Sequence, residues 1–127
     1  MSPSTSKDLQ DIQADIAAGN LPAALAALAR ALEREPENED VLYLLAVCNR
    51  YAGQHERALE ILRTLKTLSP NHSRGHQEEG HVYRDQGAHE SALLAYERAL
   101  KINPVLRACL TSQLQILTSQ RRERQAI

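Results

Sequence analysis

The sequence contains no tryptophan, no phenylalanine and only four tyrosines, so leucine, alanine and isoleucine have to build its core. Small aliphatic side chains suit helices that pack closely together. Cysteine is also scarce, because Cys48 and Cys109 are its only two representatives and they form no CxxC pair. Neither a disulfide framework nor a zinc site is therefore indicated.

Long apolar runs are absent as well. No stretch of 18 apolar residues occurs, and Met1–Asp8 lacks the charged start and apolar segment of a signal peptide. Sixteen acidic residues nearly balance fifteen basic ones, so no global field favours nucleic acid or an anionic membrane as a partner. From 127 residues we expect a single domain, 1–127, in a soluble, reducing, cytoplasmic setting.

The charges are unevenly distributed along the chain. Residues 1–40 carry eight acids and three bases, whereas residues 107–127 carry four arginines and one acid. Solvated helix faces and a charged loop explain this asymmetry, and an acidic docking patch is the alternative.

Four columns of residues recur at a fixed interval of 34 residues. The columns are Gly19, Gly53 and Gly87; Ala24, Ala58 and Ala92; Leu25, Leu59 and Leu93; and Pro36, Pro70 and Pro104. A period of this length, with small and apolar residues at helical spacing and a proline closing each unit, is typical of stacked helix–turn–helix repeats.

The pattern resembles the tetratricopeptide repeat (TPR) family. Its columns hold Leu42, Leu45, Ala46, Asn49, Ala58, Leu62 and Pro70 in the second repeat, and His76, Glu79, Gly80, Tyr83, Ala92, Tyr96 and Pro104 in the third. The resemblance implies an all-α fold, a right-handed superhelical solenoid of three helix–turn–helix units. We expect repeats at about 5–38, 39–72 and 73–106, followed by a C-terminal capping helix at about 105–122.

Local signals agree with these repeats. Each glycine column member supplies the positive φ of a sharp turn, and Pro22 falls in the first turn of the helix that follows. Glu56 and Glu90 take the same place in the later repeats, where a carboxylate meets the positive end of the helix dipole. The helices are predicted to end before each proline of the column.

After Pro104 the sequence predicts the capping helix, whose leucines Leu106, Leu110, Leu114 and Leu117 share one face. We expect this helix to give the last repeat a partner and to show Gln113, Gln115 and Ser119 to solvent. No stop signal follows, so the helix either frays or belongs to a longer protein.

The resemblance also implies a binding groove, because TPR proteins commonly bind an extended peptide or a helix along the first helices of their repeats. The groove-facing candidates are Asp40, Tyr43, Leu44, Val47, Arg50, Tyr51, Arg74, Gln77, Glu78, His81, Arg84 and Asp85. For Tyr51 the alternative is that it seals the turn. Some relatives clamp a C-terminal carboxylate, and the matching positions here are Leu9, Gln13, Leu44, Arg74 and Glu78. Only Arg74 is cationic, so a chaperone-tail receptor is disfavoured.

The first helix of the third repeat places His76 and Glu79 in columns that are normally apolar. Packing against the second repeat would bring them near Asn49, so we expect a hydrogen-bonded network, with a functional site as the alternative. His72 and His76 are four residues apart but lack a third ligand, so no physiological metal site is expected. No nucleophile motif and no phosphate-binding loop is present, and no cofactor is expected.

These observations favour a non-catalytic interaction module that binds a protein or peptide, as a monomer or weak homodimer. The alternative rests on residues 41–59 and 72–87, which resemble the repeat region ahead of the catalytic domain in bacterial TPR-containing sulfotransferases. The chain would then be the accessory part of an enzyme.

Overall fold

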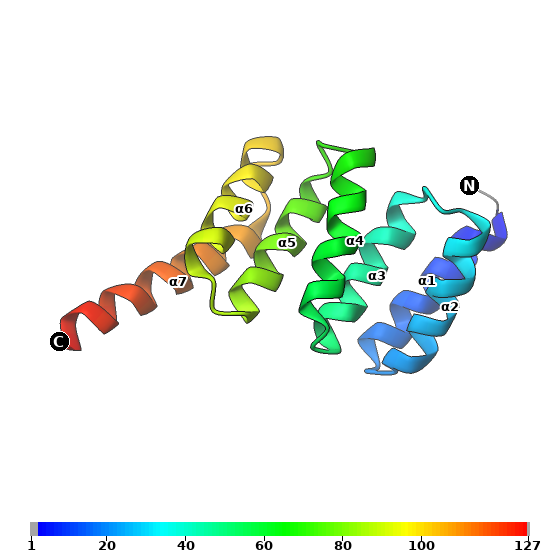
Figure 1. Ribbon diagram of the computed structural model, residues 1–127, viewed down its shortest axis with the longest axis horizontal. Helices are drawn as coiled ribbons and strands as arrows, with labels where there is room; N and C mark the ends of the chain where they lie inside the picture. Colours follow the sequence, from blue (N-terminus) through cyan, green and yellow to red (C-terminus); the bar gives the residue numbers. More distant parts are fainter. Residues whose placement is uncertain (1–2, 127) are drawn as a thin grey trace. The chain divides into compact units, whose positions relative to one another are not determined.

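A computed structural model describes the backbone of residues 3–126 and the side chains of residues 8–125. The described residues form seven α-helices and no strand: α1 (Pro3–Ala17), α2 (Leu21–Arg34), α3 (Glu39–Tyr51), α4 (His55–Leu68), α5 (Ser73–Asp85), α6 (His89–Ile102) and α7 (Arg107–Ala126). The chain divides into two compact units, an N-terminal unit (Met1–Pro70) and a C-terminal unit (Asn71–Ile127). Figure 1 shows α1 to α4 in the first and α5 to α7 in the second.

The hairpin turns form as the sequence predicts. Gly19, Gly53 and Gly87 have φ angles of 79°, 78° and 77°. Residues other than glycine rarely adopt this left-handed backbone conformation. Pro22 lies in the first turn of α2, where its missing N–H costs nothing. The second helix of each hairpin ends two residues before its proline, at Arg34, Leu68 and Ile102.

The core of the N-terminal unit lies between α1, α2 and α3. Ile12, Leu28 and Val41 are almost completely buried there, together with Ala24 and Ala31. The alanines let the helix backbones approach one another while the larger residues fill the remaining space. The core of the C-terminal unit includes three buried residues of α6 that pack with α7, namely Ala92, Tyr96 and Ala99.

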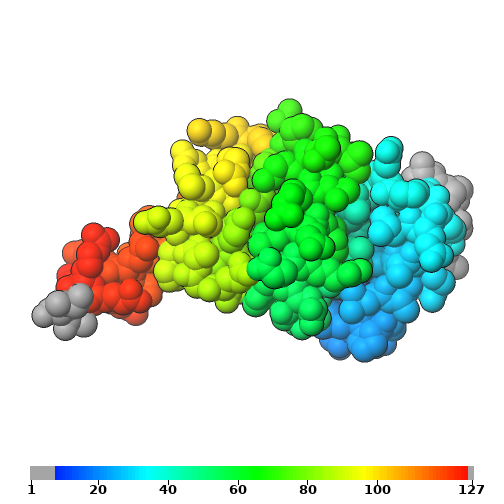
Figure 2. Space-filling model, in the orientation of Figure 1, coloured from blue at the N-terminus to red at the C-terminus, as the bar shows by residue number. Residues whose placement is uncertain are grey.

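Helix α7 packs on a different face from the one that the sequence predicts. The buried residues are Cys109, Ser112 and Ile116, whereas Leu110, Leu114 and Leu117 are exposed. The small Cys109 and Ser112 allow close approach, and their polar atoms contact Gln77 and Arg84 of α5. The prediction that the leucine face of this helix packs on the last repeat is therefore wrong for Leu110, Leu114 and Leu117. The helix begins at Arg107 and continues to Ala126, and its last turns stand clear of α5 and α6 (Figure 2).

Candidate functional site

The exposed face of α3 carries the predicted binding residues of the N-terminal unit. Asp40 is exposed in the first turn, and the partly buried ring of Tyr43 packs against the core. At the other end of the helix the Arg50 guanidinium lies 4.6 Å from the ring centre of Tyr51, and 55% of Tyr51 is exposed. A cation–π contact of this kind holds an arginine and an aromatic ring together at the surface.

Two predicted site residues of α3 lie in the interior instead. Leu44 is 7% exposed and belongs to the core that α3 shares with α1 and α2, and Val47 is 8% exposed. Burial of an apolar side chain lowers the free energy of the folded state, so Leu44 and Val47 contribute to packing and are not freely accessible to a partner. Asp40, Tyr43, Arg50 and Tyr51 remain the candidates on this helix.

On α5, three of the four predicted binding residues contact other helices of the C-terminal unit. The Gln77 Oε1 atom accepts a hydrogen bond from the Cys109 Sγ atom at 3.5 Å, and Arg84 Nη1 donates to Ser112 Oγ at 3.2 Å. His81 is buried with its Nδ1 atom 2.7 Å from the hydroxyl of Tyr96. These side chains position α7 and α6, which the sequence did not reveal, whereas Arg74 is exposed. Of the two further candidates, Glu78 is buried, and Asp85 forms an ion pair with Arg84, in which Oδ1 and Nη2 are 3.1 Å apart.

Burial governs the protonation of the groups at this contact. It is the largest influence on Tyr96 and raises the pKa of its hydroxyl, although the hydrogen bond with Ser112 acts in the opposite direction. Burial also raises the pKa of the Cys109 thiol to about 11. Both groups are therefore neutral at physiological pH, and neither is an activated nucleophile.

Two of the polar residues in the normally apolar columns, Asn49 and Glu79, have hydrogen-bond partners within their own units. Asn49 Nδ2 donates to the backbone oxygen of Leu45 at 2.8 Å, and Arg98 Nη2 donates to Glu79 Oε1 at 3.2 Å. His76 and Glu79 are both buried, each about 7% exposed. Their predicted hydrogen-bond network with Asn49 remains a prediction.

One feature that the sequence analysis missed is a hollow of about 400 Å³ in the N-terminal unit. Its wall is mostly apolar but includes the polar residues Glu33, Asn49 and Arg57. The full lining is Leu25, Ala29, Leu32, Glu33, Leu45, Asn49 and Arg57. Asn49 occupies the column that holds Tyr83 in the next repeat, and a side chain of that size would fill much of this space. The replacement of tyrosine by asparagine was thus the available signal.

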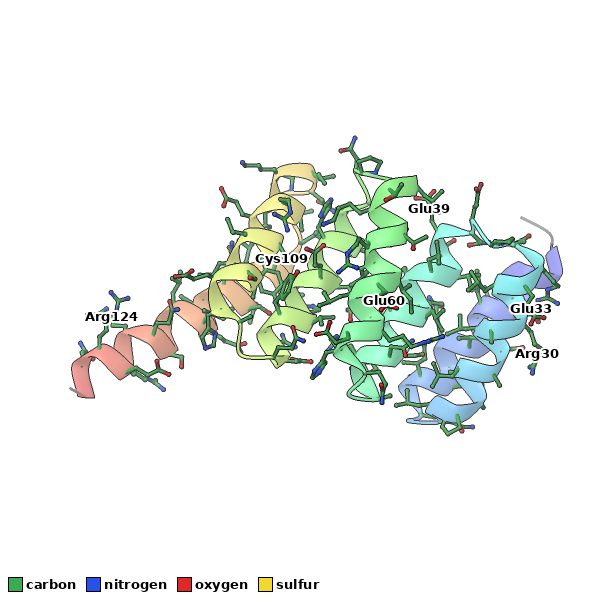
Figure 3. All side chains as sticks on the ribbon, in the orientation of Figure 1. Arg30, Glu33, Glu39, Glu60, Cys109 and Arg124 are labelled. Carbon is green, nitrogen blue, oxygen red and sulfur yellow. The ribbon has the colours of Figure 1, made fainter. Side chains whose placement is uncertain are left out.

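The acidic residues of α1 lie beside arginines of α2. Asp8, Asp11 and Asp15 share a depression with Arg30 and Arg34, and Arg34 Nη2 donates to Asp8 Oδ2 at 3.0 Å. Figure 3 shows Arg30 and Glu33 projecting from α2 into solvent. Part of the acidic excess of this segment is therefore compensated within the hairpin.

His72 has a structural role at the start of α5. Its Nδ1 atom accepts a hydrogen bond from the backbone N–H of Gly75 at 2.9 Å, which caps the helix. Within the part of the chain that the structure describes, no three histidine, cysteine, aspartate or glutamate side chains come together as metal ligands. No helix of that part is long and apolar enough to cross a membrane.

The chain belongs to the tetratricopeptide repeat family. Two models of this family match it, one at residues 15–77 and the other at residues 73–104. No curated protein matches the sequence.

Solved structures of TPR proteins share the fold. The Sgt2 TPR domain from Aspergillus fumigatus has a TM-score of 0.86 at 21% identity, over 98% of this chain and 83% of that one. The first TPR domain of Spaghetti (RPAP3), bound to an HSP90 peptide, has a TM-score of 0.80 at 14% identity, over 89% of this chain and 90% of that one. An O-GlcNAc transferase mutant from Thermobaculum terrenum has a TM-score of 0.80 at 21% identity, and the match spans 92% of this chain but only 23% of the transferase.

Proposed function

We propose that this chain is a non-catalytic protein-interaction module, which binds a peptide or helix of a partner along the first helices of its repeats. The observation that carries the proposal is its membership of the TPR family. One structure of the same fold holds a peptide of HSP90. Stacked helical repeats in general present an extended surface, and such a surface is suited to binding an extended or helical segment.

The accessible side chains of these helices have the composition of an interface. Tyr51 and Arg74 are exposed, and Tyr43 and Arg50 are partly exposed. Tyrosine and arginine are the residue types that most often dominate the binding energy of protein interfaces, because they combine a large contact area with directed hydrogen bonds. We infer that these four side chains contact the partner.

The partner is not expected to be held by a clamp on its terminal carboxylate. Of the five positions that match the clamp of some relatives, Leu9, Leu44 and Glu78 are buried and Gln13 is uncharged. Arg74 alone offers an exposed positive charge, and one exposed charge contributes little in high dielectric. The partner is instead expected to use apolar and hydrogen-bonding contacts with α3 and α5.

A pull-down with the tagged chain, followed by mass spectrometry, would identify candidate partners. The test itself is the affinity of each purified candidate for the wild type and for the Tyr43→Ala/Arg74→Ala variant. We expect at least a tenfold loss of affinity, about 1.4 kcal/mol, with unchanged helix content in circular dichroism.

A matched control replaces one apolar and one arginine side chain elsewhere. Arg63→Ala/Leu68→Ala changes two exposed residues of the second helix α4 and is expected to leave the affinity unchanged. Equal affinities of the wild type and the folded Tyr43→Ala/Arg74→Ala variant would exclude the first helices as the binding surface.

A second candidate is that the chain is the accessory repeat domain of a larger enzyme. The T. terrenum transferase favours this candidate, because a segment with this fold makes up less than a quarter of that chain. The resemblance to sulfotransferase repeat regions gains no support from the matches above. The mass of the native protein, measured after isolation from its source, distinguishes a stand-alone module from a domain of a larger chain.

A further inference from the structure

The exposed surface of α7 contains a continuous apolar stripe. Leu110, Leu114 and Leu117 are exposed by 50%, 66% and 51%, and they lie at i, i+4 and i+7 on one side of the helix. The residues that pack against α5 and α6 are Cys109, Ser112 and Ile116, which lie on another side. Three large leucines in register on an exposed helix face are a feature that marks an interaction site.

The repeat register explains what this face corresponds to. A shift of 34 residues back from α7 places Leu110, Leu114 and Leu117 on His76, Gly80 and Tyr83 of α5. At the central position, α5 is covered by the second helix of its own hairpin: a methyl group on Gly80 would come within 2.5 Å of the Tyr96 ring in α6. The leucine stripe of α7 is therefore the face that a second helix covers in the preceding hairpin.

The packed side of α7 fits the same register. A shift of 68 residues places Cys109, Ser112 and Ile116 on Val41, Leu44 and Cys48, the residues through which α3 packs on the core of the first hairpin. Helix α7 thus packs on α6 as α3 packs on α2. In the N-terminal unit, α3 also contacts α4, which is the second helix of its own hairpin. The part of the chain described here contains no helix in the corresponding position for α7.

Arginines continue the leucine stripe at both of its ends. Arg107 precedes Leu110 by three residues, and Arg121 and Arg124 follow Leu117 by four and seven, so all three lie on the same side of the helix. They are exposed, and Arg124 lies at the far end of α7, clear of α5 and α6 (Figure 3). Glu123, the only acid of the helix, lies on the opposite side.

We propose that α7 is the first helix of a fourth hairpin, and that an amphipathic helix of a partner protein completes this hairpin. The charge pattern defines the chemistry of that helix: apolar residues in its middle meet the leucines, and acidic residues at both ends meet the arginines. The stripe from Arg107 to Arg124 is about 26 Å long, which corresponds to about 18 residues of the partner helix. A second copy of α7 fits poorly, because parallel and antiparallel pairing both place arginine opposite arginine.

The probe for this proposal is an 18-residue peptide that carries the sequence of α4, His55–Leu68, between two glutamates at each end. Helix α4 is this chain's own second helix, and its buried face consists of Ala58, Leu62 and Leu65. Isothermal titration calorimetry of the full chain with this peptide is expected to show saturable binding with 1:1 stoichiometry. A matched peptide with two lysines at each end is expected to bind at least tenfold more weakly.

Variants of the protein assign the binding to the stripe. Leu114→Asp is expected to weaken binding of the glutamate peptide at least tenfold. The control Leu94→Asp, at a leucine of α6 that is 55% exposed, is expected to leave the binding unchanged. Because Leu114 is exposed, its variant should fold, which circular dichroism checks. The Arg121→Glu/Arg124→Glu variant is expected to reverse the preference from the glutamate peptide to the lysine peptide.

Three results would overturn the proposal. The first is the absence of saturable binding, and the second is binding that neither Leu114→Asp nor the charge reversal alters. The third is a concentration-dependent dimer in sedimentation equilibrium that Leu114→Asp dissociates, since the stripe would then bind a second copy of the chain.

Discussion

The ring of Tyr96 lies directly against the backbone of Gly80. A methyl group at residue 80 would come within 2.5 Å of the Cε1 atom and 2.6 Å of the Cδ1 atom of that ring. The ring cannot move aside without loss, because Tyr96 is fully buried and its hydroxyl is 2.7 Å from His81 Nδ1. At this point the two helices α5 and α6 approach each other too closely to leave room for a side chain on residue 80.

Gly80→Ala is therefore expected to destabilise the protein by at least about 1 kcal/mol, because overpacking exceeds the gain in helix propensity. Urea unfolding measures the change. Combining it with Tyr96→Leu should remove most of the added penalty, since the two residues are in contact and their effects are not additive. A Gly80→Ala variant as stable as the wild type would contradict the close packing of the two helices.

Tyr96→Phe is expected to cost about 1–3 kcal/mol, because it removes the hydroxyl that meets His81 and Ser112 in the interior. Thermal and urea unfolding check this value. Tyr51→Phe is the matched control: that hydroxyl belongs to an exposed side chain, and the change is expected to stay within about 0.5 kcal/mol. Equal stabilities of the two variants would show that the buried hydroxyl contributes nothing.

Ala58→Leu and Ala92→Leu are each expected to destabilise the protein by about 1–3 kcal/mol. Both alanines are completely buried where helices meet, and a larger side chain forces the helices apart. Ala26→Leu serves as the control, because Ala26 is on the exposed side of α2 and leucine has a similar helix propensity. Unfolding midpoints of the two variants that match the control would mean that the alanine column does not mark the helix contacts.

The Cys109 thiol links stability to alkaline pH. Its pKa is raised by burial from 9.0 to about 11, so the unfolded chain releases this proton at a lower pH than the folded one. The contribution of this group to stability is complete below pH 9 and is lost as the pH rises through about 11. As the pH rises from 9 to 11, the free energy of unfolding of Cys109→Ala is expected to fall less than that of the wild type. Urea unfolding at each pH measures the two values.

The same burial predicts slow chemistry at this thiol. In a Cys48→Ala background, Cys109 is expected to react with Ellman's reagent at pH 8 far more slowly in the native protein than in urea, because the reactive thiolate is both scarce and inaccessible. Rapid reaction of the folded protein would show that α7 detaches readily from α5 and α6.

The sequence by itself determined the repeat architecture of this protein. Glycine at a positive φ angle and proline after the helix are local requirements of the backbone, so Gly53 and Pro70 marked the turn and the end of α4 without any knowledge of the fold. The column of Ala58 and Ala92 likewise marked the positions where helices touch, since a repeat of fixed length has to reuse the same contact.

Only the tertiary structure decided which face of each first helix is accessible. Leu44 and His81 satisfy the spacing of a surface residue, yet one packs in the apolar core and the other meets the buried hydroxyl of Tyr96. Helix α7 has apolar residues on two sides. The side with the small Cys109 and the polar Ser112 is buried, and the leucine side is exposed, because Cys109 and Ser112 fit against α5 and form hydrogen bonds with it. Helical periodicity gives the angle between two faces, but the shape and polarity of the neighbouring helices determine which of them is buried.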